Sequence, residues 1–288
     1  MKISALLFLL VLACPAPRAQ DFDRTRAVDA PAPDTLALVS ATPIAGLGLV
    51  SFREGLLARR PAVNPDWLDA PLRSQVEEGD RVRTGPRGRS EIEFQANNVL
   101  RLAPSTTLCL TQLLQEERES ALKVDLQLEE GDVWAELNGL DEDDDFTVRS
   151  QVMGAAITGT GFRLSVDQDR ETVLTVLHGE VRVAADDEGL ARDPRLGLSV
   201  DSLSTLLQEA RPARKGGAPV PVAGPTPVAG PREVSLKEWM IIVKGMQEVR
   251  IGADGTVRAA GNISSAGNSA WVRWNLERNK ARQTRQGH

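Results

Sequence analysis

The chain has 288 residues, of which 41% are hydrophobic and 26% are charged, and its formal net charge is −6. These values are typical of a globular protein and exclude a wholly disordered chain or a membrane protein with several spans. The acidic balance argues against nucleic-acid binding, because neutralising phosphates requires a basic stripe.

The first 20 residues have the features of a secretory signal peptide. An eleven-residue apolar run covers positions 3–13, and cleavage after Ala19 would remove residues 1–19. The segment ending at Cys14 also resembles a bacterial lipobox, so Cys14 is a candidate for lipid attachment. The apolar run is too short to span a membrane and no later run is longer, so we expect no transmembrane span. The protein is expected in the periplasm, either free or lipid-anchored at the outer membrane.

Residues 20–66 are predicted to form an extended leader. They contain five of the 17 prolines, a spacing that interrupts any long helix or strand. One apolar patch, at residues 36–52, is expected to add one or two strands to the domain that follows.

Alternation of apolar and polar residues dominates residues 67–200. Residues 122–128 (LKVDLQL) alternate without exception, as expected for a strand with one buried face. We predict a mainly β fold of stacked short strands, a sandwich or a solenoid. Further strand-like runs cover residues 91–94, 99–102, 146–149, 162–166 and 181–183, and turn signals separate them at 78–80, 85–88, 130–132, 138–139 and 178–179.

Residues 201–232 are predicted to be a linker rich in proline, glycine and alanine. A short helix is expected at 202–208, and two copies of PVAGP follow, at 221–225 and 227–231. This composition is typical of an extended, semi-rigid linker. An ordered strap along the β domain stays open as the alternative.

Residues 233–288 are predicted to form a small α+β module with a basic tail. Ser235 and Glu238 fit a helix capping box. Apolar residues at 239, 242, 243 and 246 predict one face of a helix over residues 235–247. A hairpin is expected around the turn sequence GADG at 252–255. The basic residues between 273 and 285 are expected on a frayed, solvated tail.

Four motifs occur in order along the middle of the chain: GDRVRT at 79–84, LEEGDVW at 128–134, ITGTGF at 157–162 and VLTVLHGEVRV at 173–183. Together they resemble the FecR domain, the extracytoplasmic domain named after a regulator of ferric citrate uptake. We interpret the motif glycines as tight reversals between strands, which need a residue without a Cβ atom. The residues that match the family motifs are Gly79, Asp80, Gly131, Gly159, Thr160, Phe162 and Gly179.

The resemblance implies an all-β fold of stacked short strands with no catalytic residue, no cofactor and no metal site. Regulators of this family carry a cytoplasmic anti-sigma segment and a transmembrane helix before the domain, and we find neither in this sequence. Thr158 also stands where the family has a basic residue. A link to sigma-factor control therefore stays open.

No motif in the sequence predicts catalysis. A Ser-His-Asp or Cys-His site needs a histidine base, and neither His178 nor His288 lies near a nucleophile motif. The acidic run at residues 141–145 starts like an EF-hand loop but continues with Phe146 and Val152, where glycine and a chelating glutamate are required.

The favoured hypothesis is a non-catalytic envelope protein whose β domain binds another envelope protein or relays a signal. The alternative is a module that binds cell-wall or exopolysaccharide glycans, for which Trp67 and Trp134 are the candidate exposed rings. A hydrolase with an unrecognised pair of acidic residues is the least favoured hypothesis.

Overall fold

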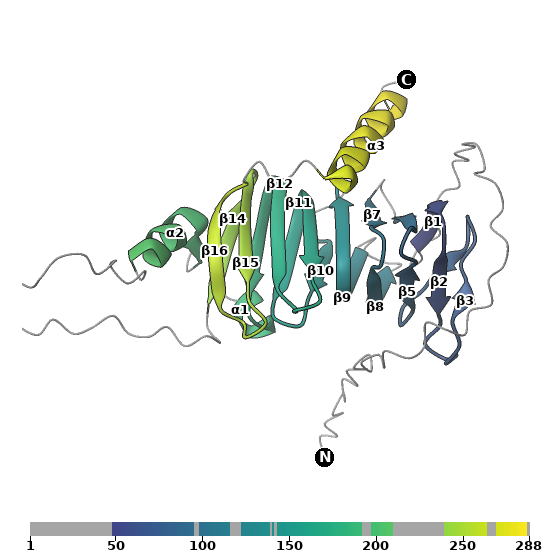
Figure 1. Ribbon diagram of the computed structural model, residues 1–288, viewed down its shortest axis with the longest axis horizontal. Coiled ribbons are helices and arrows are strands. Elements are labelled where there is room, and N and C mark those ends of the chain that lie inside the picture. Colours follow the sequence, from purple (N-terminus) through teal and green to yellow (C-terminus); the bar gives the residue numbers. More distant parts are fainter. Residues whose placement is uncertain are drawn as a thin grey trace, which may run out of the picture.

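The structure is a computed structural model that describes residues 48–94, 98–115, 122–138, 140, 143–191, 197–209, 239–263 and 269–286. The predicted signal peptide with Cys14, residues 20–47 of the leader, residues 210–232 of the linker and the capping box lie outside the described residues. Figure 1 shows the described elements as coloured ribbons.

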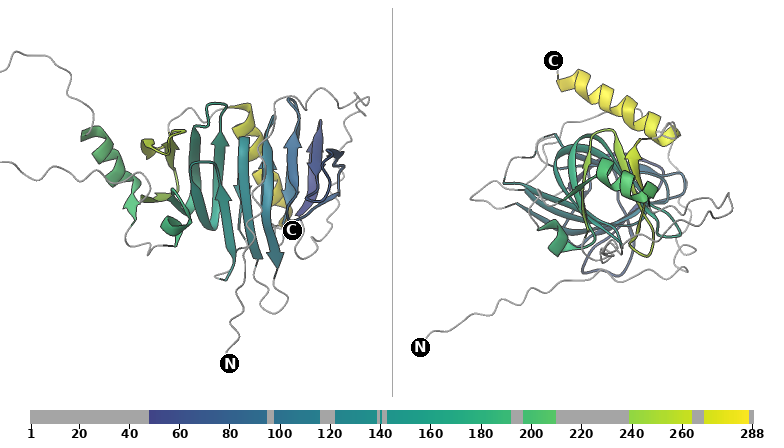
Figure 2. Two further views of the ribbon diagram at one scale, coloured as in Figure 1. Left: turned by 90° about the horizontal axis from the view of Figure 1, so that it is seen from below. Right: turned by 90° about the vertical axis from the view of Figure 1, so that its left-hand side faces the viewer.

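Sixteen strands of the described residues pair into one continuous sheet that folds into two layers. They stack along the long axis of the molecule (Figure 1), and the view along that axis shows them curving around the interior (Figure 2). This confirms the mainly β fold. Layer A contains, in order of pairing, β3 (Leu68–Asp69), β2 (Leu57–Arg60), β5 (Arg81–Thr84), β8 (Thr107–Gln115), β9 (Leu122–Glu136), β10 (Asp145–Arg149), β11 (Gly154–Val166), β12 (Thr172–Ala184), β14 (Met240–Lys244) and β13 (Leu198–Ser199). Layer B contains β4 (Gln75–Val76), β1 (Gly48–Glu54), β6 (Arg89–Glu93), β7 (Val99–Leu102), the other halves of β9, β11 and β12, and then β15 (Gln247–Ile251) and β16 (Val257–Asn262).

Three long strands connect the layers by bending at a glycine. β9 pairs with β10 through residues 123–127 and with β11 through residues 131–136, so its neighbours change near Gly131. β11 and β12 change neighbours in the same way near Gly159 and Gly179. The three glycines have φ angles of 103°, 61° and 84°, a region that residues with a Cβ atom disfavour. The tight reversals predicted here are wrong, because the chain bends and the strand continues.

The hydrophobic core lies between the two layers. Alternation along the strands places Leu126, Val133, Phe162 and Val181 on the inner faces, where all four are completely buried. Burying one aliphatic or aromatic side chain of this kind stabilises a fold by about 1.5–3 kcal/mol. The alternation in the sequence therefore predicted strands correctly at residues 99–102, 122–128, 146–149, 162–166 and 181–183.

The first two strands lie inside the predicted leader. β1 pairs with β6 in layer B, and β2 pairs with β5 in layer A. This confirms, for residues 48–52, that the apolar patch adds a strand to the β domain. The β domain therefore begins before Trp67.

The helix predicted at residues 235–247 is wrong over its described part. Residues 240–244 form β14, which pairs with β12, and Gln247 starts β15. Ile241 and Val243 are completely buried while Ile242 between them is half-buried, so the residues alternate as a strand does. The same apolar residues happen to fit a helical spacing as well. The predicted hairpin is confirmed by the pairing of β15 with β16, and these strands extend the main sheet.

Three helices accompany the described strands. α1 (Asp187–Leu190) follows β12, and α2 (Val200–Glu209), which confirms the helix predicted at 202–208, packs beside β16 at one end of the stack (Figure 1). α3 (Ala270–Gln286) returns to the middle of the stack and lies over layer B. The prediction of a frayed basic tail is therefore wrong for these residues. No helix in the described part of the chain combines the length and the apolar character needed to cross a membrane.

Candidate functional site

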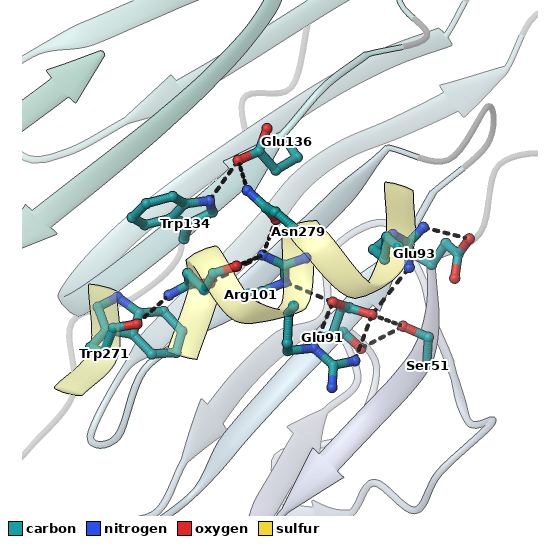
Figure 3. Close-up of polar contacts among 11 residues, drawn as sticks. Ser51, Glu91, Glu93, Arg101, Trp134, Glu136, Trp271 and Asn279 are labelled. Atoms are coloured by element: carbon teal, nitrogen blue, oxygen red, sulfur yellow. Dashed lines mark hydrogen bonds and ion pairs between the residues drawn. The ribbon is translucent and has the colours of Figure 1, made fainter. Parts of the chain in front are cut away.

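Ion pairs attach α3 to the outer face of layer B. Glu91 on β6 is completely buried, and its carboxylate accepts a hydrogen bond of 2.7 Å from Arg101 Nε on the neighbouring strand β7. Arg278 and Arg282 of α3 reach the other carboxylate oxygen at 3.2 and 3.3 Å, and Ser51 donates to it at 3.0 Å (Figure 3). One carboxylate from the sheet thus contacts three arginines, two of them from the helix.

The charges around Glu91 control its ionisation. Burial raises the pKa of the Glu91 carboxyl, but the positive charges of Arg101 and Arg278 outweigh burial and lower the pKa from 4.5 to about 2. Burial lowers the pKa of Arg101, and the charge of Glu91 opposes this change. Glu91 is therefore ionised at any physiological pH.

A second set of hydrogen bonds centres on Glu136 of β9. Its carboxylate accepts a hydrogen bond of 2.9 Å from Trp134 Nε1 and another from Asn279 of α3. It also contacts His178 Nε2 at 2.9 Å. Asn279 also accepts a hydrogen bond of 2.6 Å from Arg101. The helix, β7 and β9 therefore share one polar network (Figure 3).

Aromatic side chains form the apolar part of this contact. Trp271 and Trp274 of α3 stack with their ring centroids 5.1 Å apart, and Trp274 lies 5.5 Å from Phe52 of β1. The guanidinium of Arg278 lies over Phe52, 4.2 Å from its centroid. Trp271 also donates a hydrogen bond of 3.0 Å to Asp132.

Beside α3, the outer face of layer B remains open and forms a groove of about 700 Å³. Its floor comes from β9, β11, β12 and β15, and one wall comes from α3. Two large apolar side chains that line it are mainly exposed: Met246, in the turn before β15, at 62%, and Leu276 of α3 at 54%. Leu177, Val173, Val272 and Ile263 add apolar surface.

Both arginines that line the groove form ion pairs with acidic residues. Arg163 contacts both carboxylate oxygens of Asp132, at 3.0 and 2.9 Å from Nε, and Arg250 lies 2.7 Å from Glu171. Burial raises the pKa of Asp132 although Arg163 and Trp271 oppose it. Burial lowers the pKa of Arg163, but the hydrogen bonds and charge of Asp132 raise it overall, and the charge of Glu248 adds to this effect.

A smaller cavity of about 250 Å³ lies beside α1 on the outer face of layer A. Arg149, which lines it, is already bound to Asp125 and Asp187. Among the described residues, no group of three or more His, Cys, Asp and Glu side chains is arranged to hold a metal ion.

The residues that match the family motifs have structural positions in this fold. Thr160 and Gly179 touch where β11 and β12 bend, since a Cβ atom on Gly179 would lie 2.5 Å from Thr160 Cγ2. Gly159 lies at the same bend, and Phe162 follows it into the core. Gly131 bends β9 elsewhere, against Thr106, and Gly79 and Asp80 form the turn before β5, where Asp80 pairs with Arg59 at 3.1 Å.

Neither of the two tryptophans proposed for glycan binding is fully exposed. Trp134 is only 1% exposed and packs in one cluster with Trp271 of α3, so it offers no exposed ring to a ligand. Trp67 is half-buried and has the guanidinium groups of Arg83 and Arg60 over its ring, at 4.1 and 5.3 Å from the centroid. The prediction of an exposed Trp134 is wrong.

Sequence reasoning missed the polar network below α3. Alternation placed Glu91 and Arg101 on the face opposite the core, which is normally solvent-exposed. A signal was present in the tail, because Trp271, Asn275, Arg278 and Arg282 recur at intervals of four, three and four residues and so share one helix face. Because three of these four residues are polar or charged, a search for apolar periodicity does not detect this face.

Comparisons with known proteins identify the domain. Residues 80–182 match the model of the family described as FecR, FecR protein. Two crystal structures of a candidate anti-sigma factor from Parabacteroides distasonis ATCC 8503, at 1.65 and 2.50 Å resolution, are also similar; each is 13% identical with a TM-score of 0.40, and the match covers 67% of this chain. The match spans 64% and 63% of those two chains, less than two thirds of their length. No curated protein matches the chain. The match to the FecR family over residues 80–182 confirms, for that segment, the resemblance found in the sequence.

Proposed function

We propose that the protein is a non-catalytic module of the bacterial envelope that binds a protein partner and relays a signal, and that the groove beside α3 is the binding surface. The FecR-family domain supports a regulatory role. The observation that carries the proposal is the exposure of Met246 and Leu276, at 62% and 54%, in one groove. Large apolar side chains that gather on a surface mark interaction sites.

The position of the groove suits a relay. Leu276 and Val272 come from α3, while Leu177 and Met246 come from β12 and the turn before β15. A partner in the groove would therefore contact the helix and the sheet together. Any shift of α3 on binding would reach β6 and β7 through Arg278, Arg282 and Glu91.

Crosslinking in living cells tests the binding surface. A photoreactive amino acid at position 246 or 276 should trap one discrete protein, whereas the same group at Leu206 of α2, which is 52% exposed and outside the groove, should not. Equal products at all three positions, or recovery only with isolated cell wall, would contradict the proposal; the second result would favour glycan binding.

The envelope location rests on the sequence of residues 1–19. Deleting residues 2–19 should leave the protein in the cytosol in a cell fractionation experiment. Changing Cys14 to Ala should release it from the outer membrane only if Cys14 carries a lipid. A full-length protein that stays in the cytosol would contradict the envelope location.

A further inference from the structure

We infer that the groove binds a protein segment in which a lysine or arginine side chain lies next to apolar residues, and that Glu248 receives the cation. This inference rests on the proposed function and specifies the chemistry of the partner. Its basis is the distribution of charge on the groove floor.

The arginines of the groove already have partners. Arg163 is bound through Nε and Nη2 to Asp132, and Arg250 pairs with Glu171. Four carboxylate side chains line the groove, from Glu136, Asp167, Glu171 and Glu248, against these two arginines. The groove therefore has an excess of negative charge.

Of the three lining carboxylates outside these arginine pairs, Glu248 has the fewest contacts. It lies on β15 opposite Thr175 of β12 and lines the groove. Its side chain is half-buried, and it makes no ion pair and no side-chain hydrogen bond with any described residue, although its charge acts on Arg163 at longer range. Glu136, in contrast, is bound to Trp134 and Asn279, and Asp167 accepts a hydrogen bond from the backbone of Glu171.

A partly desolvated carboxylate favours a cationic partner. A lysine or arginine at Glu248 would form a charge-assisted hydrogen bond, and an acidic segment would be repelled. Met246 lies two residues before Glu248, and Leu276 and Leu177 line the same groove. Apolar residues next to the cation would cover these side chains, so one segment would satisfy both parts of the groove.

Peptide binding to the purified protein tests this inference. The probes are three fluorescent twelve-residue peptides that alternate leucine with lysine, with glutamate or with serine, measured by fluorescence anisotropy. We expect the lysine peptide to bind most tightly. Glu248→Gln should weaken its binding about fivefold and Glu248→Lys more than tenfold, as expected for the loss of one ion pair of about 1 kcal/mol and its replacement by repulsion.

Glu180 provides the matched control, because it lies exposed on β12 and does not line the groove. Glu180→Gln should bind the lysine peptide as the wild type does. Thermal unfolding of the variants excludes loss of the fold as the cause. Equal binding of the lysine and glutamate peptides, or unchanged binding by Glu248→Lys, would overturn the inference.

The two proposals fail in different ways. If Met246 crosslinks to a discrete partner in cells but Glu248→Lys leaves the crosslink unchanged, the charge preference is wrong and the binding surface stands. If positions 246 and 276 give no discrete crosslink in cells, the proposed function and this inference fail together.

Discussion

The outer face of layer B has a half covered by α3 and an open half that forms the groove, and the two halves hold carboxylates in different states. Under the helix, Glu91 contacts Arg101, Arg278 and Arg282, and its pKa falls to about 2 despite complete burial. Between the helix and the groove, Asp132 contacts Trp271 of α3 and a single described arginine, Arg163 of the groove, and burial raises its pKa. Both carboxylates lose water, so the number of nearby cations decides the direction of the shift.

This difference suggests different roles for the two halves. The covered half contains groups whose charges are paired several times, as expected of a contact that holds α3 in place. The open half contains exposed apolar side chains and a carboxylate that makes no ion pair or hydrogen bond with the described residues, as expected of a surface that binds another molecule. Four substitution experiments test this division, in order of decreasing effect.

The largest effect is expected from Arg101→Met. It removes the cation closest to Glu91 inside the protein, and breaking a buried ion pair costs about 3–5 kcal/mol of stability. Denaturant unfolding measures this loss. The double variant Glu91→Gln with Arg101→Met should lose less than the sum of the two single variants. Additive losses would show that the two residues act independently.

The second largest effect is expected from lowering the pH, which should change the contributions of Glu91 and Asp132 to stability in opposite directions. Since the pKa of Glu91 is about 2 in the fold and 4.5 as its ordinary value, its ionised form contributes about 3 kcal/mol, fully present above pH 4.5 and lost as the pH falls towards 2. The stability difference between wild type and Glu91→Gln should therefore disappear in acid. The pKa of Asp132 is raised rather than lowered in the fold. The wild type should therefore gain stability relative to Asp132→Asn as the pH falls. Parallel pH profiles for both variants would contradict the comparison.

A smaller effect is expected from the arginines of α3. Arg278→Gln and Arg282→Gln should each cost about 1 kcal/mol, because their side chains are 14% and 20% exposed and their ion pairs are only partly desolvated. Arg273→Gln on the exposed face of the same helix is the control and should change stability by less than about 0.5 kcal/mol. Higher salt should reduce the difference between Arg278→Gln and wild type.

The smallest effect is expected in the groove. Met246→Asn and Leu276→Gln should change the free energy of unfolding by no more than about 0.5 kcal/mol, because both side chains are largely exposed. The same variants should lose crosslinking or peptide binding. A large loss of stability would show that these residues hold the fold together.

Local patterns predicted the β fold well, because a strand with one face on the core alternates apolar and polar residues. They failed where two patterns fit the same residues. Trp239, Ile242, Val243 and Met246 satisfy a helical spacing, and pairing with β12, about 60 residues earlier, makes the segment a strand. The glycines were correctly singled out, but local sequence cannot distinguish a reversal from a bend within one long strand, since both use positive φ angles.

The candidate site was predicted less well, for a physical reason. Glu91 and Arg101 look like ordinary outward residues of two strands, and only α3 buries them. The groove combines residues from four strands, one turn and one helix. No segment of the sequence carries its pattern, although the helix face of Trp271, Asn275, Arg278 and Arg282 offered a partial signal.

The pairing of Arg282 with Glu91 joins residues that are 191 positions apart. During synthesis, β6 and β7 leave the ribosome long before α3, so Glu91 and Arg101 stay exposed to water until the helix has been made. Contacts of such high sequence separation form slowly and late in folding. Refolding experiments should therefore show the burial of Trp134 below α3 among the last events.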